Sequence, residues 1–281
     1  MKILNINLSS ENSGSDLVKS FRETGFAVIT NHDIDPQLIK DAYLEWESFF
    51  QSHIKHSFKF NSQDTYQAGF FPFRSENAKD NPIKDLKEFY HVYSPKDYPT
   101  FFQMKATEKL RKSLIKLGNE LLLLIQQNTD PSVFQSSEPL ESMVDPQHLT
   151  LFRILHYPPL FNQSETGAIR ASAHEDINLI TLLPAATQSG LQVKDIDGKW
   201  HDIKSNFGNI IVNVGDMLQL ASNNYFKSTT HQVVNPNGEE ALKPRYSMPL
   251  FVAPREDVML SKNKSAKEYL NERLLEIGLK K

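Results

Sequence analysis

Short β-rich segments separated by turns follow one another through the second half of the chain, and this pattern constrains the fold more than any other feature. Asp197-Gly198, between two of these segments, is a strong signal for a tight hairpin turn. Closely spaced strands joined by turns are typical of an antiparallel sandwich or jelly roll and argue against a parallel sheet. The pattern therefore predicts a mainly β fold. The expected strands cover residues 149–157, 169–173, 177–183, 191–196, 210–214, 229–234 and 246–252.

The first half of the chain is predicted to be mixed and mostly helical. Residues 26–30 form a strand candidate. Asp35-Pro36 begins a helix that runs to about residue 51, with proline in the first turn, where it is favoured. Leucines spaced three and four apart predict an amphipathic helix over 107–127 that faces a core. A further helix is expected at the C-terminal end, over 264–278.

Composition and charge exclude several kinds of partner and site. The chain has 281 residues and a formal net charge of −3, which gives no electrostatic reason to expect a nucleic acid or an anionic membrane as partner. It has no cysteine, so disulfides, thiolate metal sites and cysteine nucleophiles are impossible. No apolar stretch approaches the ~20 residues that span a bilayer, and the N-terminus lacks the apolar run of a signal peptide. A cytoplasmic enzyme or binding protein is expected, with an oligomeric state that the sequence leaves open.

His174-Glu175-Asp176 is the first candidate metal site. Side chains two apart on a strand point to the same face, so His174 and Asp176 could bind one ion while Glu175 faces away. The pair alone is weak evidence, because nine histidines and 34 acidic residues in 281 positions produce such a pair by chance. His231, inside a later strand candidate, supplies a second imidazole. Two imidazoles and one carboxylate form the facial triad that leaves positions open on Fe(II) for a co-substrate and dioxygen.

Arg245 and Ser247 form a second group of candidate residues. They follow His231 in the sequence and lie two apart on one expected strand, so they share a face. A guanidinium gives paired, charge-assisted hydrogen bonds to a carboxylate. Deep in a barrel, Arg245 and Ser247 therefore suit the distal carboxylate of a co-substrate.

Six motifs occur in the order found in a known family. They are RILHYPP at 153–159, HED at 174–176, GLQV at 190–193, NVGDML at 213–218, KSTTHQVVNP at 227–236 and RYSMP at 245–249. Together they resemble the isopenicillin N synthase-like branch of the 2-oxoglutarate/Fe(II)-dependent dioxygenases, almost continuously from residue 147 to 254. Residues 21–32 also resemble the opening helix and strand of that family.

This resemblance implies the fold, the cofactors and the site residues. The fold would be a double-stranded β-helix (a jelly roll) flanked by N-terminal and C-terminal helices. The cofactors would be Fe(II), with 2-oxoglutarate as co-substrate, dioxygen as oxidant and ascorbate as an optional reductant. The implied iron ligands are His174, Asp176 and His231. The residues implied to hold the distal carboxylate of 2-oxoglutarate are Arg245, Ser247 and a family tyrosine at Tyr157.

Two positions depart from the family pattern. The asparagine that the family usually has two residues before the tyrosine is Leu155 here, so one expected hydrogen bond is missing. Many relatives have threonine between the first two metal ligands, where this chain has Glu175, whose strand parity keeps it off the metal.

The resemblance also implies an activity and a division of the chain. The expected activity is oxidation of a small-molecule substrate, most simply hydroxylation, with desaturation or ring closure as other outcomes. The expected parts are an N-terminal dioxygenase-type region over 1–105, a core-packing helix and connector over 106–146, the jelly roll over 147–254 and a C-terminal helix over 255–281, all in one compact unit.

Other functions stay open on the sequence alone. A related iron oxidase could keep Arg245 and Ser247 without using 2-oxoglutarate, and a jelly-roll protein could bind a metal or ligand without turnover. A zinc hydrolase could use the same three metal ligands, but the arginine and serine would then have no assigned role. The substrate is not indicated. Candidate substrate contacts are Arg170, Arg74 and Tyr90, each with a purely structural role as the alternative.

Overall fold

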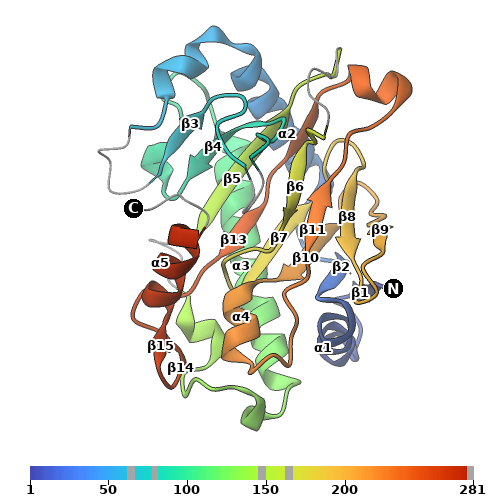
Figure 1. Ribbon diagram of the computed structural model, residues 1–281, viewed down its shortest axis with the longest axis vertical. Helices are drawn as coiled ribbons and strands as arrows, with labels where there is room; N and C mark the ends of the chain where they lie inside the picture. The colour runs from blue at the N-terminus through green and yellow to red at the C-terminus, as the bar shows by residue number, and fades with distance from the viewer. Residues whose placement is uncertain (62–66, 78–81, 145–149, 162–166, 277–281) are drawn as a thin grey trace.

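A computed structural model describes residues 1–61, 67–77, 82–144, 150–161 and 167–276, and two β-sheets dominate it (Figure 1). The larger sheet contains, in order of pairing, β1 (Leu4–Asn7), β2 (Phe26–Thr30), β10 (Ile210–Val214), β7 (Ile180–Pro184), β13 (Leu250–Val252), β5 (Leu151–Tyr157), β4 (Glu88–Val92) and β3 (Gly69–Phe71), with β12 (Arg245–Ser247) also paired to β5. The smaller sheet contains β6 (Ala171–His174), β11 (His231–Val233), β8 (Leu191–Lys194) and β9 (Trp200–Asp202). A short hairpin, β14 (Met259–Ser261) and β15 (Lys264–Ser265), precedes the last helix.

Within the described residues, every strand pairing is antiparallel except that of β1 with β2. Apolar side chains from the two sheets pack together, among them Phe26 of β2, Leu155 of β5 and Val193 of β8. The predicted jelly roll is confirmed. Strands from the first hundred residues extend the larger sheet at both edges, with β1 and β2 at one and β3 and β4 at the other.

Some strand bounds differ from those predicted. The strand predicted over 246–252 is divided into β12 and β13. Pro249 lies between them and has no N–H to donate to a neighbouring strand. Its carbonyl instead accepts a hydrogen bond from the backbone N–H of Arg153 at 3.0 Å. The strand predicted over 149–157 begins at Leu151, because Thr150 is not part of it, and residue 149 lies outside the described residues.

Helices cover the face of the larger sheet that is turned away from the smaller sheet (Figure 1). The helices on this face are α1 (Ser13–Thr24), α2 (Pro36–Gln51) and α3 (Lys105–Gln127). The other two helices are α4 (Asp216–Ala221), which follows β10, and α5 (Ala266–Glu276), which follows the hairpin of β14 and β15. No helix in the described part of the chain is both long enough and apolar enough to cross a lipid bilayer.

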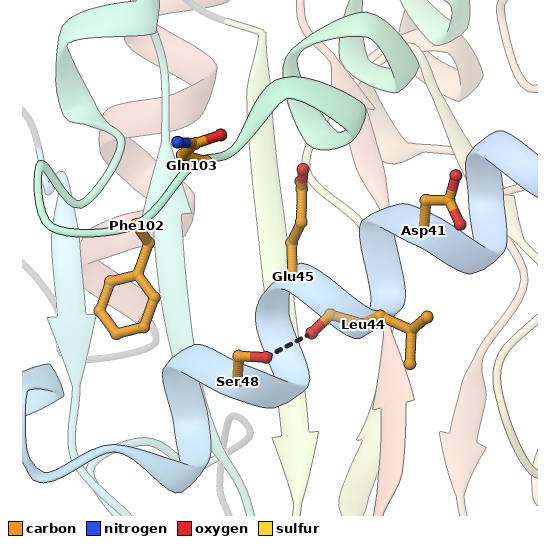
Figure 2. A pocket seen from close by; sticks show the side chains of 6 residues that line it. All are labelled: Asp41, Leu44, Glu45, Ser48, Phe102 and Gln103. Atoms are coloured by element: carbon orange, nitrogen blue, oxygen red, sulfur yellow. Dashed lines mark hydrogen bonds between the residues drawn. The ribbon is translucent and has the colours of Figure 1, made fainter.

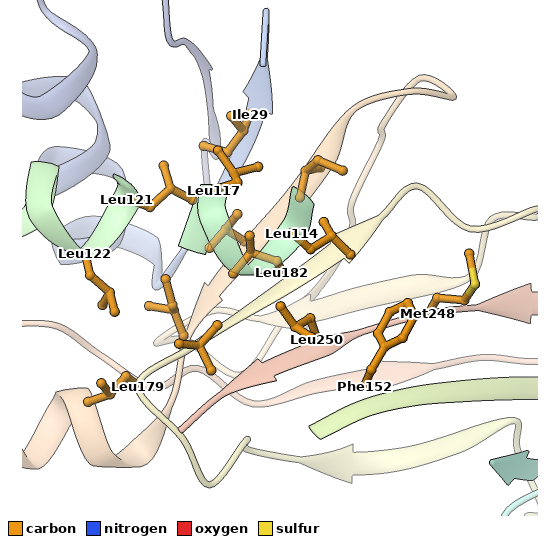
Figure 3. Close-up of a cluster of buried hydrophobic side chains, with 14 of the residues drawn as sticks. Ile29, Leu114, Leu117, Leu121, Leu122, Phe152, Leu179, Leu182, Met248 and Leu250 are labelled. Carbon is orange, nitrogen blue, oxygen red and sulfur yellow. The ribbon is translucent and has the colours of Figure 1, made fainter. Parts of the chain in front are cut away.

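Helix α3 packs on the larger sheet through the leucine stripe predicted from the sequence. Leu114, Leu117 and Leu121 are buried and point toward the strands (Figure 3). At Gly118, on the same face, an added Cβ would meet Val252 at 3.1 Å and Leu182 at 3.5 Å. The glycine therefore allows the helix to approach the sheet closely.

Helix α3 begins two residues earlier than predicted because Glu45 of α2 caps it. The Glu45 carboxylate accepts hydrogen bonds from the backbone N–H groups of Ala106 and Thr107, both at 2.9 Å, and from the Thr107 hydroxyl at 2.6 Å. Figure 2 shows this side chain pointing from α2 toward the start of α3, in a surface hollow. The residues that line the hollow are Asp41, Leu44, Glu45, Ser48, Phe102 and Gln103. None of the candidate site residues lines it.

We expect Glu45→Ala to lower the free energy of unfolding by about 1–2 kcal/mol, because helix N–H groups at the start of α3 lose their acceptor. Denaturant unfolding followed by circular dichroism measures this. Asp41→Ala is the matched control, since its exposed carboxylate on the same helix bonds only the side chain of Gln37 among the described residues. Equal stability of the two variants would contradict the capping role of Glu45.

Candidate active site

The structure brings His174, Asp176 and His231 together. His174 ends β6 and His231 begins β11, and the two are register partners in the smaller sheet. The Asp176 Oδ1 atom lies 3.7 Å from His231 Nε2 and 3.9 Å from His174 Nε2. One potential ligand atom from each residue lies within 4.8 Å of the other two, so a single ion could contact all three. No other group of this kind is present among the described residues.

Asp176 reaches this position from a loop and not from the strand that the sequence predicted. Strand β6 ends at His174, so the argument from strand parity was wrong for Asp176. The chain leaves the sheet because the carbonyl of Asp176 accepts the backbone N–H of Asp216 at 2.8 Å, at the start of α4. Glu175 points elsewhere, as expected, and its carboxylate accepts the hydroxyl of Thr230.

Both imidazoles are oriented by backbone carbonyls. His174 Nδ1 lies 2.7 Å from the carbonyl oxygen of Ser172, and His231 Nδ1 lies 3.1 Å from that of Thr229. A neutral imidazole that donates from Nδ1 presents the lone pair of Nε2, the atom that faces Asp176 in each case. Burial, followed by the neighbouring His231, lowers the pKa of His174 to about 4, which favours this neutral form.

The Asp176 carboxylate is fixed by hydrogen bonds to its other oxygen. Oδ2 accepts from the Thr181 hydroxyl at 2.6 Å and from the Asn213 amide at 2.8 Å. The Asn178 amide in turn donates to the Thr181 hydroxyl at 2.8 Å. Burial opposes ionisation, but the two histidines and these hydrogen bonds together lower the pKa of Asp176 below its usual value. Oδ1 is thereby kept available, as a charged oxygen, on the side of the histidines.

We expect Thr181→Val to weaken divalent metal binding by about 10- to 100-fold, because outer hydrogen-bond partners orient metal ligands. Competition with a chelator under anaerobic conditions measures the Kd for Fe(II). Thr30→Val is the control, since it removes a threonine hydroxyl that bonds the Ile6 carbonyl in another part of the larger sheet. An unchanged Kd in Thr181→Val would show that the carboxylate does not need this contact.

Asp85, which the sequence reasoning missed, connects the N-terminal region to His174. Its Oδ1 accepts from the backbone N–H of Ser172 at 3.0 Å and from the Ser172 hydroxyl at 2.7 Å. The carbonyl of the same serine is the partner of His174 Nδ1. The other oxygen of Asp85 pairs with Lys87 at 2.8 Å, and Lys87 also pairs with Glu76 at 2.9 Å. This buried network therefore braces the strand that carries the first histidine.

Arg245, Ser247 and Tyr157 lie together on paired strands, and we refer to them as the anion site. Arg245 on β12 is the register partner of Tyr157 on β5, and its guanidinium carbon lies 5.0 Å from the centre of the tyrosine ring. Arg245 is buried, and its Nε donates to the backbone carbonyl of Gln188 at 3.1 Å. Its Nη1 is also buried but has no hydrogen-bond partner among the described residues. Leu155, which stands in place of the family's asparagine, is the register partner of Ser247.

The three candidate substrate contacts lie in different surroundings. Arg170 is fully buried close to the anion site, 5.9 Å from the Tyr157 ring. Arg74 is half-buried in the turn after β3. Tyr90 packs among Trp46 and other aromatic side chains of the helix-covered core, where its hydroxyl donates to the carbonyl of Asp97.

The position of Tyr90 does not support the expected substrate contact. Strand β4 alternates, so Tyr90 faces the helices and the neighbouring Phe89 faces the smaller sheet. Phe89, which stacks on Phe71 at 4.6 Å, takes the inward position.

Comparisons with known proteins agree with this geometry. Residues 148–254 match the model of the 2OG-Fe(II) oxygenase superfamily, and residues 4–112 match that of the N-terminal region of non-haem dioxygenases in morphine synthesis. A protein of Shewanella oneidensis described as an oxygenase is 45% identical, with a TM-score of 0.87 over 99% of this chain and 100% of that one. Jasmonate-induced oxygenase 4 of Arabidopsis thaliana is 30% identical over 87% of this chain and 69% of its own length.

The chain belongs to the 2-oxoglutarate/Fe(II) oxygenase superfamily. This oxygenase is therefore a non-haem oxidoreductase that depends on Fe(II) and 2-oxoglutarate and uses dioxygen as co-substrate. The structure of JOX2 in complex with 2OG, Fe and JA has the same fold, with a TM-score of 0.78 and 22% identity over 98% of this chain and 85% of that one.

The residues present fit both Fe(II) and 2-oxoglutarate, which this family requires. Two imidazoles and one oriented carboxylate are a donor set suited to Fe(II) with open coordination positions. The buried Arg245 Nη1 without a partner fits a carboxylate, since an orphaned buried donor is costly unless a ligand accepts its hydrogen bond.

Proposed function

We propose that this oxygenase hydroxylates a small organic molecule, with His174, Asp176 and His231 as the iron ligands and the anion site as the binding place for the distal carboxylate of 2-oxoglutarate. The observation that carries this proposal is the combination of two features in one molecule. A preoriented group of two histidines and an aspartate lies at the ends of β6 and β11. A buried arginine with an unused donor lies on β12, the strand that pairs with β5 of the larger sheet.

The residues of the chain contribute to the reaction mainly by orienting the bound metal and co-substrate and by excluding water. When bound, Fe(II) would activate dioxygen, which is the oxidant, and decarboxylation of 2-oxoglutarate to succinate would supply two electrons, so that one oxygen atom could be added to a substrate C–H bond. Thr181 and Asn213 hold one oxygen of Asp176, so that the other faces the metal position. Arg245 orients the co-substrate by binding its far end. Phe26, whose ring meets that of His231 edge-on at 5.5 Å, belongs to the apolar cluster that keeps the space between the sheets dry.

The proposed substrate class rests on the relatives. The named relatives include a gibberellin 2-beta-dioxygenase and jasmonate-induced oxygenases, and JOX2 was crystallised with JA, all of them names that refer to small organic molecules. We therefore propose a small-molecule substrate, with neither a nucleic acid nor a membrane as partner. A cytoplasmic location and the division of the chain at 105, 146 and 254 stay predictions.

Turnover of 2-oxoglutarate tests this function. The purified protein with Fe(II), 2-oxoglutarate and fractions of a metabolite extract is expected to form succinate and carbon dioxide in step with oxygen consumption. Oxygen consumption without succinate would instead indicate an iron oxidase that does not use 2-oxoglutarate. Binding of a metabolite without any oxygen consumption would indicate a jelly-roll binding protein without turnover.

A further inference from the structure

Arg170 is a buried cation whose protein contacts leave it incompletely paired. It lies directly before β6 and is fully buried. Its Nη1 donates to the side-chain oxygen of Gln188 at 3.0 Å, and its Nη2 donates to the carbonyl of Lys243 at 3.3 Å. Among the described residues, its buried Nε has no hydrogen-bond partner, and no carboxylate forms an ion pair with it. Both acceptors are neutral, so the positive charge has no counterion in contact within the part of the chain that the structure describes.

Arg170 and Arg245 share their surroundings. Gln188 binds both, through its side-chain oxygen to Arg170 and through its backbone carbonyl to Arg245 at 3.1 Å. Both guanidinium carbons lie near the Tyr157 ring, at 5.9 Å and 5.0 Å from its centre. Burial and then the charge of Arg245 lower the pKa of Arg170 to about 10, which still leaves it charged at neutral pH. Two positive charges, each with a buried donor that has no partner among the described residues, thus lie near the Tyr157 ring.

We propose that Arg170 is a second arginine for the distal carboxylate of 2-oxoglutarate, held in place by Gln188. This inference rests on the proposed function, because it takes the anion site as the place where that carboxylate binds. A buried charge without a counterion is strongly unfavourable, and a carboxylate can accept about four hydrogen bonds, enough for both arginines. Tyr157 reduces the repulsion between the two cations, since the face of an aromatic ring attracts positive charge.

The position of Arg170 favours the co-substrate over the substrate as its partner. It precedes His174 by four residues along β6, which corresponds to about 13 Å of extended strand. The reacting carbon of a substrate must lie beside the metal position, whereas Arg170 is tied to Gln188 and Lys243 next to Arg245. Lys243 stands only two residues before Arg245 in the chain.

The test compares two ligands that differ in the distal carboxylate. The full-length protein loaded with Ni(II), which does not turn over, is titrated calorimetrically with 2-oxoglutarate and with 2-oxobutanoate. The ratio of the two Kd values measures the preference for the distal carboxylate. We expect Arg170→Met to reduce this preference by about ten- to a hundred-fold, the effect of one lost hydrogen bond between charged groups. Arg170→Lys should recover part of it.

A second variant covers the case in which Arg170→Met fails to fold. Gln188→Glu places a carboxylate where the Gln188 side-chain oxygen contacts Arg170, so it should pair with the arginine and reduce the same preference. Lys243→Met is the control, because it removes an exposed charge and leaves the backbone carbonyl that Arg170 uses. We expect its preference to equal that of the wild type.

The outcomes separate this inference from the function on which it rests. An unchanged preference in folded Arg170→Met, or in Gln188→Glu, overturns the role of the second arginine. Equal loss of affinity for both ligands also overturns it, because a merely structural role would have that effect. A wild-type protein without any preference, or an Arg245→Gln variant that keeps it, contradicts the proposed function itself.

Discussion

Asp176→Ala is expected to abolish 2-oxoglutarate-dependent oxygen consumption while the metal-free protein keeps its fold. Asp176 supplies the only carboxylate of the metal group, and its Oδ1 faces both histidines. Two imidazoles alone would not fix the position of an ion. Removal of an outer hydrogen-bond partner of a metal ligand weakens metal binding by about 10- to 100-fold. The loss in Fe(II) affinity of Asp176→Ala should therefore be larger than this. Oxygen uptake and chelator competition measure the two effects, and circular dichroism checks the fold.

Glu175→Ala is the matched control for this variant. Glu175 is the adjacent acidic residue, but its carboxylate bonds Thr230 and takes no part in the metal group. We expect its Fe(II) affinity to stay close to that of the wild type. Turnover by Asp176→Ala at high Fe(II) concentration would refute the assignment of the carboxylate ligand.

Arg245→Gln is expected to raise the KM for 2-oxoglutarate strongly. Loss of a charge-assisted contact in a buried site should cost about 2–4 kcal/mol, or on the order of 30- to 1000-fold in KM. Iron affinity should barely change, because Arg245 belongs to the anion site and not to the metal group. Steady-state kinetics over a range of 2-oxoglutarate concentrations give the KM.

Arg245→Lys and a stability measurement complete this experiment. Lysine should recover only part of the affinity, because a point charge does not reproduce the planar fork of a guanidinium. If Arg245 only braced β12, Arg245→Gln would lose stability and keep its KM. That result, in an active enzyme, would contradict the binding of the 2-oxoglutarate carboxylate by Arg245.

The features that could be predicted from the sequence are those set by local pattern. The strands at 26–30 and 210–214 have the predicted bounds, because short apolar runs form buried central strands. The leucine spacing predicted the buried face of α3. The convergence of the metal group was also predictable, since His174, Asp176 and His231 fall in motifs of recognisable order.

The features that were missed depend on contacts between distant segments. Thr181 and Asn213 orient Asp176 because they are register partners on β7 and β10, and nothing in the local sequence fixes that register. Asp85 acts on His174 through Ser172, across the boundary between the N-terminal region and the jelly roll. The sequence also contained no sign that Tyr90 faces the helices and Phe89 faces the smaller sheet, because both neighbours are aromatic.

The most direct test of the central claim is a crystal structure of the protein grown without oxygen in the presence of Fe(II) and 2-oxoglutarate, with anomalous data collected at the iron edge. We predict one anomalous peak at about 2.0–2.2 Å from Nε2 of both histidines and from Oδ1 of Asp176. We also predict density for 2-oxoglutarate, with its distal carboxylate on the guanidinium of Arg245. A metal bound away from these three residues, or 2-oxoglutarate bound without a contact to Arg245, would contradict the account.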